Sequence, residues 1–172
     1  EVVNMAKLVA SLAEDGVALS RGRHTIDTDI SCNQAVLGQV DELRSACLNL
    51  VTNAVRYTPD GGKIEISWRY DPKEESAIFA VQDNGIGIDA EDIPRLTERF
   101  YRVDKSRSKA TGGTGLGLAI VKHIVAQHGA KLTLESEQGK GTEIRVEFSE
   151  ALKQHEIETA KQRQEVHAER SE

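Results

Sequence analysis

Three segments of the chain carry side chains and glycines that could bind a nucleotide together with a metal ion. They are Asn49–Tyr57, Asp83–Ile88 and Gly112–Ile120, in this order along the sequence. The first supplies two amides, the second a carboxylate followed by two glycines, and the third a glycine-rich turn. Each segment alone is a weak signal, but their combination and order predict a site for an adenine nucleotide and its metal ion.

Asn49 and Asn53 lie one helical turn apart, and Arg56 and Tyr57 continue the same face of the predicted helix. Asparagine is a mediocre helix former, because its side chain competes for backbone hydrogen bonds. One interpretation is that the two amides hydrogen-bond to a neighbouring loop. The other is that their carbonyl oxygens bind a hard cation such as Mg²⁺ that also holds phosphates, with Arg56 supplying positive charge. These residues alone leave both interpretations open.

Asp83 follows a predicted strand and is followed closely by Gly85 and Gly87. These residue types favour turns, so a plain turn is one interpretation. The alternative is that the carboxylate accepts a hydrogen bond from an exocyclic amine such as that of adenine. In that case the two glycines allow the backbone to pass close to a ligand.

The segment Gly113–Gly117 opens a predicted helix, where unpaired N–H groups and the helix dipole favour an anion. No Lys-Ser/Thr follows, so it is not a Walker loop, and the charged loop before it does not fit a dinucleotide fingerprint. We predict phosphate binding here; the alternative is a flexible hinge. Residues 98–114 carry five basic and two acidic side chains, a net charge of +3, and we predict that they form a lid over the phosphates.

Hydrophobic spacing predicts the elements that must position these segments. Helices are expected over 1–19, 41–57, 89–97 and 116–128, and Val2 is expected on the apolar face of the first. Strands are expected over 24–30, 63–70, 76–82, 131–136 and 142–148. Thr58–Gly62 ends the second helix, and Gly129 caps the last one. The pattern predicts an α+β fold, a two-layer α/β sandwich in which a mixed, mostly antiparallel sheet carries three main helices on one face.

Composition sets outer limits on the class of protein. The 172 residues suit one domain, expected over 1–149, followed by a charged tail over 150–172 that is either a solvated helix or disordered. A net charge of −6 argues against nonspecific binding to nucleic acid. Cys32 and Cys47 are too few for a disulfide framework and are expected to be buried free thiols in a reducing cytosol. No apolar run is long enough for a membrane span and no signal peptide is visible, although the chain lacks an initiating Met and fits a piece of a longer protein.

The chain resembles the catalytic, ATP-binding domain of bacterial sensor histidine kinases, which have the Bergerat fold shared with gyrase-, Hsp90- and MutL-type ATPases. The resemblance covers residues 1–149. It rests on five segments: the N box (49–57), the G1 box (83–88), the F box (99–102), the G2 box (113–118) and a final glycine turn (139–142). Residues 97–105 and 117–123 further resemble the phosphate-regulon sensor kinases.

The resemblance implies a role for each matching residue. Asn53 would be the Mg²⁺ ligand with Asn49 as a second candidate, and Arg56, where the family commonly has Lys, would contact phosphate. Tyr57 would lie against the adenine or ribose, Asp83 would bond the adenine amino group, and Arg102 would neutralise the γ-phosphate. The other positions implied to contact ATP are Gly85, Gly87, Lys105, Gly113, Thr114, Gly115, Leu116, Gly117, Leu118 and Thr142.

The hydrolysing relatives carry a Glu where this chain has Asn49, and an amide cannot activate water. We therefore expect Asn49 and Arg102 to serve phosphate transfer to an external nucleophile. The acceptor His of the family is absent; His155-Glu-Ile-Glu-Thr159 lacks the Arg and Pro of its motif, and His24, His123, His128 and His167 have structural explanations.

The resemblance also implies partners and a cellular location. They are the phosphoacceptor and dimerisation domain of the same kinase and a PhoB-like response regulator, with no nucleic acid. The fragment is expected to be a soluble, cytoplasmic monomer, and the parent a homodimer anchored in the bacterial inner membrane. Two alternative functions are a hydrolysing ATPase of the gyrase/Hsp90 type and a nucleotide-sensing module without catalysis.

Overall fold

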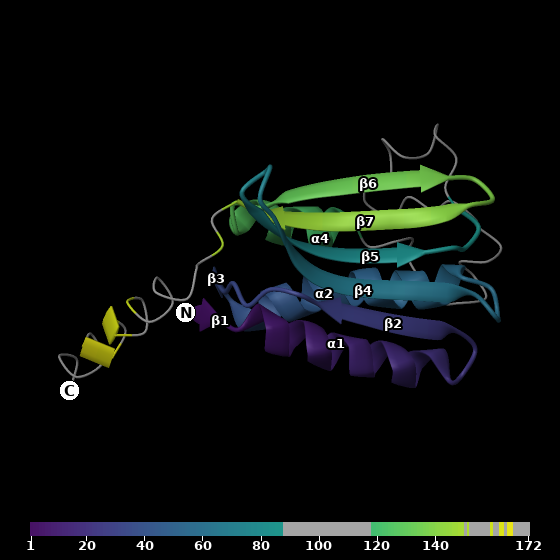
Figure 1. Cartoon of the computed structure of the whole chain (residues 1–172), viewed down its shortest axis with the longest axis horizontal. Helices are drawn as coiled ribbons and strands as arrows, with labels where there is room; N and C mark the ends of the chain where they lie inside the picture. Colours follow the sequence, from purple (N-terminus) through teal and green to yellow (C-terminus); the bar gives the residue numbers. More distant parts are fainter. Residues whose placement is uncertain (88–117, 150, 152–158, 160–161, 164, 167–172) are drawn as a thin grey trace.

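The computed structural model describes residues 1–87, 118–149, 151, 159, 162–163 and 165–166. The predicted helix over 89–97, the lid over 98–114, the phosphate-binding turn over 113–117 and most of the tail lie outside these residues. The described elements form two layers, a sheet and a group of helices (Figure 1).

The main sheet has five strands in the order β2-β4-β5-β7-β6. They are β2 (Thr25–Ile30), β4 (Lys63–Asp71), β5 (Ser76–Asp83), β6 (Lys131–Glu137) and β7 (Gly141–Phe148). Strand β2 runs parallel to β4, and the other pairs are antiparallel. This confirms the predicted mixed, mostly antiparallel sheet and both predicted hairpins.

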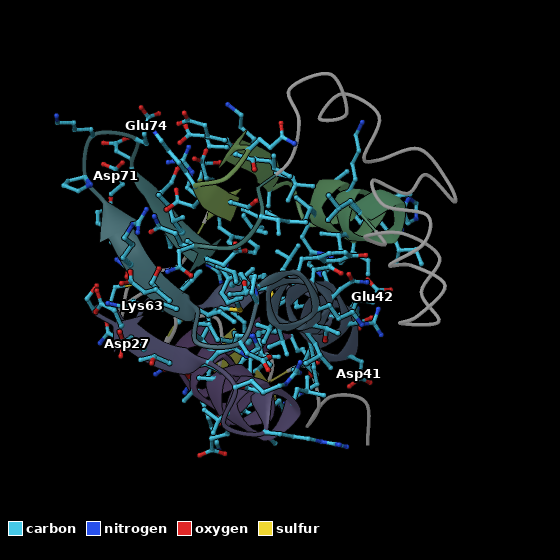
Figure 2. All side chains as sticks on the ribbon, turned by 90° about the vertical axis from the view of Figure 1, so that its right-hand side faces the viewer. Asp27, Asp41, Glu42, Lys63, Asp71 and Glu74 are labelled. Carbon is cyan, nitrogen blue, oxygen red and sulfur yellow. The ribbon has the colours of Figure 1, made fainter. Side chains whose placement is uncertain are left out.

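Among the described elements, three helices cover one face of this sheet (Figure 2). They are α1 (Met5–Ser20), α2 (Val40–Tyr57) and α4 (Leu118–Gln127). Helix α2 lies between the other two and packs against both. On the opposite face of the sheet, Asp27 and Lys63 point toward one another from β2 and β4, with 3.3 Å between Oδ2 and Nζ.

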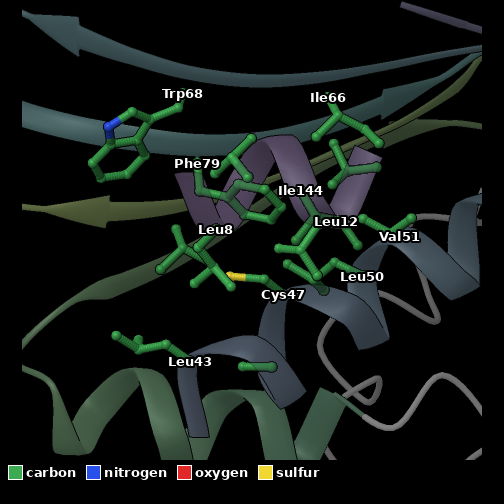
Figure 3. Close-up of a cluster of buried hydrophobic side chains, with 14 of the residues drawn as sticks. Leu8, Leu12, Leu43, Cys47, Leu50, Val51, Ile66, Trp68, Phe79 and Ile144 are labelled. Atoms are coloured by element: carbon green, nitrogen blue, oxygen red, sulfur yellow. The ribbon is translucent and has the colours of Figure 1, made fainter. Parts of the chain in front are cut away.

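The core lies between the two layers (Figure 3). Alternation along β4 turns Ile64, Ile66 and Trp68 toward the helices, and all three are fully buried. The Trp68 ring packs edge-on against Phe148, with 5.8 Å between the ring centroids. The helices pack against these residues with apolar faces whose residues recur at helical spacing. Helix α2 contributes Leu43, Cys47, Leu50, Val51, Ala54 and Val55.

The start of the chain differs from the prediction. Val2 belongs to a two-residue strand, β1 (Val2–Val3), which pairs with β3 (Val36–Leu37), and not to the apolar face of the first helix. Helix α1 begins after Asn4, whose side-chain oxygen accepts a hydrogen bond of 3.1 Å from the Lys7 N–H. This N-cap separates the strand from the helix, and the pattern of apolar residues does not show it.

Both cysteines are free thiols, as predicted, but the predicted burial is confirmed for Cys47 and wrong for Cys32. Cys47 is buried in α2, and burial raises the pKa of its thiol to about 12. Cys32 is half-buried, and burial raises the pKa of its thiol as well.

Candidate nucleotide-binding site

The side-chain amides of Asn49 and Asn53 contact each other on the surface of helix α2. The Asn53 Nδ2 donates to the Asn49 Oδ1 over 3.2 Å, as expected for polar side chains one helical turn apart. Asn53 is only 6 % exposed, and Val51, Ala54 and Val55 around it on α2 belong to the core. Amide oxygens are hard ligands that suit Mg²⁺, so the pair fits one small oxygen-preferring cation bound together with phosphates. In residues 1–87 and 118–149, no group of three or more His, Cys, Asp or Glu gathers as metal ligands would.

Asp83 ends the central strand β5, between Ile64 of β4 and Thr142 of β7. Its Oδ1 accepts a hydrogen bond of 2.8 Å from the Gly85 N–H. Burial raises the pKa of this carboxyl, and hydrogen bonds from the backbone of Gly85 and Thr142 lower it in part. A partly buried carboxyl held by backbone donors is a well-oriented hydrogen-bond acceptor for a ligand amine.

The loop after Asp83 touches two other predicted segments. A Cβ on Gly85 would lie 2.7 Å from the Tyr57 carbonyl oxygen and 3.2 Å from the Thr58 Cα, so only glycine fits against the end of α2. Gly87 has a φ of +72°, and a Cβ there would collide with the Glu137 carbonyl at the β6–β7 turn. The structure therefore brings together the N box, the G1 box and the final glycine turn. It also gives both glycines a packing reason that the sequence does not reveal.

The remaining predicted residues differ in their surroundings. Arg56 is exposed and Tyr57 half-buried in the last turn of α2, and the Thr142 hydroxyl lies 2.8 Å from the Ser136 hydroxyl. Leu118 opens α4, but its side chain is in the core, so any contact with a nucleotide would come from its backbone. Seven predicted positions fall outside the described residues: Arg102, Lys105, Gly113, Thr114, Gly115, Leu116 and Gly117.

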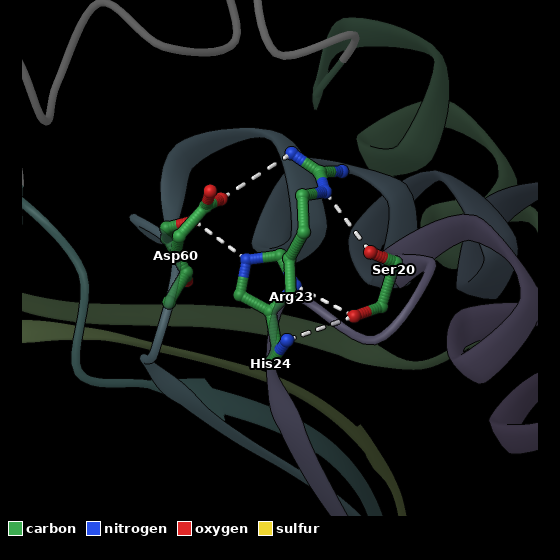
Figure 4. A network of polar contacts seen from close by, with 5 residues as sticks. Ser20, Arg23, His24 and Asp60 are labelled. Atoms are coloured by element: carbon green, nitrogen blue, oxygen red, sulfur yellow. Dashed lines mark hydrogen bonds and ion pairs between the residues drawn. The ribbon is translucent and has the colours of Figure 1, made fainter.

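The structure also shows a neighbour of the site that the sequence does not indicate. His24, predicted as the first residue of a strand, lies just before β2, and its Nε2 is 2.7 Å from the Thr58 carbonyl oxygen (Figure 4). The two residues are 34 positions apart, and no local pattern connects them.

Residues 38–152 match the family described as histidine kinase-, DNA gyrase B- and HSP90-like ATPase. The chain belongs to this family. Within it, the named relatives are sensor histidine kinases, and this domain corresponds to their catalytic ATP-binding domain.

Two relatives are phosphate regulon sensor proteins named PhoR. The protein from Pseudomonas aeruginosa is 53% identical over 145 residues, which are 84% of this chain and 32% of the relative. The protein from Haemophilus influenzae is 44% identical over 139 residues, 81% of this chain and 32% of the relative. The chain thus spans about a third of the length of these curated relatives.

Solved structures agree with the fold. The mycobacterial sensor histidine kinase MprB superposes with a TM-score of 0.75 at 29% identity, covering 86% of this chain and 97% of that one. Full-length ShkA in complex with AMPPNP gives a TM-score of 0.74 at 27% identity, covering 89% of this chain and 31% of that one. The part of this chain that the structure describes has no helix of the length and apolar character needed to cross a membrane.

Proposed function

We propose that this domain binds Mg-ATP and donates the γ-phosphate to a histidine on a separate dimerisation domain. The observation that carries the proposal is the hydrogen-bonded amide pair Asn49 and Asn53 on α2, the helix whose end packs against Gly85 in the loop after Asp83. The pair offers oxygen ligands for a metal ion but no carboxylate to activate water.

In the proposed complex, residues of this chain bind and orient the nucleotide. Asp83 accepts a hydrogen bond from the adenine amino group, and Tyr57 lies against the adenine or ribose. Asn53, with Asn49 as a second ligand, would hold the Mg²⁺, and the ion would supply positive charge for the phosphates. Arg56 adds positive charge, and Arg102 and Lys105 with the turn Gly113–Gly117 complete the phosphate site.

The transfer step needs only positioning and charge neutralisation. A ring nitrogen of the acceptor histidine attacks the γ-phosphorus, and the bond from that phosphorus to the bridging oxygen of the β-phosphate breaks. ADP leaves with the electron pair, and the imidazole proton passes to solvent. No water enters the reaction, in keeping with an amide at Asn49.

The finer assignment is phosphate-starvation signalling in a two-component system with a PhoB-like response regulator. It is supported by the two PhoR relatives at 53% and 44% identity. We further propose that residues 1–149 form the catalytic unit, with a lid over 98–114, and that the parent is a homodimer anchored in the inner membrane.

The direct test mixes this chain with γ-labelled ATP, Mg²⁺ and the separate dimerisation domain of the Pseudomonas aeruginosa PhoR. We expect label on the acceptor histidine, stable to base and labile to acid, and no label when Mg²⁺ is chelated. A version of the acceptor domain with its histidine replaced by Gln is the matched control.

Two outcomes favour the other classes. Phosphate release near one per second without an acceptor indicates a hydrolysing ATPase of the gyrase/Hsp90 type. Tight ATP binding with no transfer to any acceptor domain indicates a nucleotide-sensing module. The absence of binding at millimolar Mg-ATP contradicts the proposal itself.

A further inference from the structure

His24 joins the end of α1 to the end of α2 through its imidazole ring (Figure 4). Its Nε2 lies 2.7 Å from the Thr58 carbonyl oxygen, and its Nδ1 lies 2.9 Å from the Ser20 Oγ. A carbonyl oxygen can only accept, so Nε2 carries the hydrogen. The Ser20 Oγ accepts from the His24 backbone N–H over 3.0 Å and can give its own proton to Nδ1.

Thr58 connects the His24 hydrogen bond to the nucleotide site, because it contacts both His24 and the loop after Asp83. It caps α2 directly after Tyr57, is 2 % exposed, and donates its own N–H to the Ala54 carbonyl over 3.1 Å. On its other side, Gly85 packs so closely that a Cβ would lie 3.2 Å from the Thr58 Cα. Thr58 therefore lies between His24 and the loop that follows Asp83.

We propose that His24 is a positioning residue for ATP: its bond to the Thr58 carbonyl fixes the last turn of α2 against the Asp83–Gly87 loop. The last turn carries Arg56 and Tyr57, and the loop begins with Asp83, so the bond sets the spacing between the two halves of the site. His24 itself does not contact the nucleotide. The inference rests on the proposed function of the site that it serves.

A neighbouring contact offers a natural control. Arg23 and Asp60 form an ion pair of 3.8 Å next to this network, with side chains 45% and 78% exposed. An exposed pair of this length contributes little, so its removal should leave the end of α2 in place. Asp60→Asn is accordingly the control that alters the same turn without touching the His24–Thr58 bond.

The test uses two substitutions that separate the two ring nitrogens. A Gln at position 24 places its amide nitrogen near the position of Nε2 and keeps the donor to Thr58. An Asn places its amide near Nδ1, so it keeps the partner of Ser20 and loses the bond to Thr58. We expect the dissociation constant for Mg-AMPPNP to rise about five- to ten-fold in His24→Asn, and to stay within about two-fold of the wild type in His24→Gln and Asp60→Asn.

A general loss of stability is controlled by Leu8→Ala, a core substitution in α1 twelve residues before Ser20. If His24 only stabilised the fold, affinity would follow the unfolding midpoint across all four variants. In phosphotransfer, a positioning role raises the KM for ATP in His24→Asn and leaves kcat at saturating ATP nearly unchanged. Equal affinities of the folded Asn and Gln variants overturn the inference.

The wild-type protein gives a second measurement that needs no variant. If the bond favours nucleotide binding, nucleotide binding must protect the bond by the same factor. We therefore expect exchange of the His24 Nε2 hydrogen with solvent to slow about five- to ten-fold in saturating Mg-AMPPNP, and an unchanged rate overturns the inference. Failure of the wild type to bind Mg-AMPPNP at all would instead contradict the proposed function.

Discussion

Among single residues, Asp83 is the one whose burial opposes the ionisation of its own carboxyl. The pKa of its carboxyl is raised by burial, so the folded state binds a proton more readily than the unfolded state does. The stability that this group contributes is fully present below its ordinary pKa of 3.8 and is lost as the pH rises through the higher pKa of the folded state. At neutral pH, the charge needed to bind the adenine amine therefore costs stability.

The substitution Asp83→Asn should separate these two effects. We expect its stability relative to the wild type to increase between pH 4 and pH 7, because the amide carries no charge that must be desolvated. We also expect nucleotide affinity to fall about ten- to hundred-fold, as for loss of a hydrogen bond to a charged group. Urea unfolding at both pH values and titration with Mg-AMPPNP measure the two quantities. Asp29→Asn, exposed on β2, is the control. If the stability of Asp83→Asn relative to the wild type falls between pH 4 and pH 7, burial does not oppose the ionisation of Asp83.

Asn53 gives a second prediction for a single residue. Mg²⁺ should increase the affinity for nucleotide in the wild type, and Asn53→Ala should reduce this increase about ten-fold or more. The reason is that even the loss of a residue that hydrogen-bonds to a metal ligand commonly lowers metal affinity by that factor. Affinity measured in EDTA should change much less. Thr52→Ala, on the same turn of α2, is the control, and circular dichroism checks that both variants fold. A full Mg²⁺ effect in folded Asn53→Ala would remove this residue from the metal site.

Among whole elements, the start of α2 and the end of α4 are joined by hydrogen bonds of one histidine, His128. The His128 Nδ1 lies 2.7 Å from the Ile124 carbonyl oxygen and must donate, so Nε2 is the acceptor for the Gln39 N–H at 3.1 Å. Gln39 is the N-cap of α2, and His128 follows the last turn of α4. Gly38 lies so close that a Cβ there would collide with the Cδ2 of the His128 ring.

This geometry predicts strong coupling between Gly38 and His128. Gly38→Ala should destabilise the wild type, because the new methyl group collides with a ring that is held at both nitrogens. In the background His128→Ala the same change should cost about 1–3 kcal/mol less, since the ring is gone. Urea unfolding of the two single variants and the double variant measures this coupling. Additive effects would show that the ring moves aside freely.

The same elements show what could be predicted from the sequence. The hairpin of β4 and β5 was predicted because Ile64, Ile66 and Trp68 alternate with polar residues, and α2 because its apolar residues recur every three or four positions. Strands β1 and β3 were missed, because two residues are too few to show a period.

At the site, sequence motifs marked Asn53 and Asp83, whereas the contacts of Thr58 with His24 and Gly85 were not predictable. Those contacts join residues 34 and 27 positions apart and are set by how α2 packs on the sheet. A glycine in a motif such as Asp83–Ile88 can allow close approach of a ligand, of a neighbouring backbone segment, or of both. Only the folded chain shows which backbone segment lies against it.

For the whole molecule, the site depends on segments that meet only when the sheet and helices are packed. The end of α2, the end of β5 and the β6–β7 turn contact one another through Gly85 and Gly87. The strand β7 closes this arrangement, since it pairs with both β5 and β6. Folding and nucleotide binding should therefore be lost together when the chain is shortened into β7.

Shortening the chain tests where this unit ends. Ala151 still packs against the core, whereas the described tail residues Thr159, Gln162, Arg163, Glu165 and Val166 are all exposed. Removal of residues 152–172 should therefore leave the unfolding midpoint within about 2 °C of that of the full chain, a shift that corresponds to well under 1 kcal/mol. Affinity for Mg-AMPPNP should be unchanged.

The control chain, ending at Arg145, loses the buried side chains of Val146 and Phe148. Each such side chain contributes about 1.5–3 kcal/mol on burial, and the lost strand pairing adds to this, against a total stability of about 5–15 kcal/mol. The control should therefore fail to fold, and a clear drop in the midpoint of the longer chain would mean that the tail belongs to the domain.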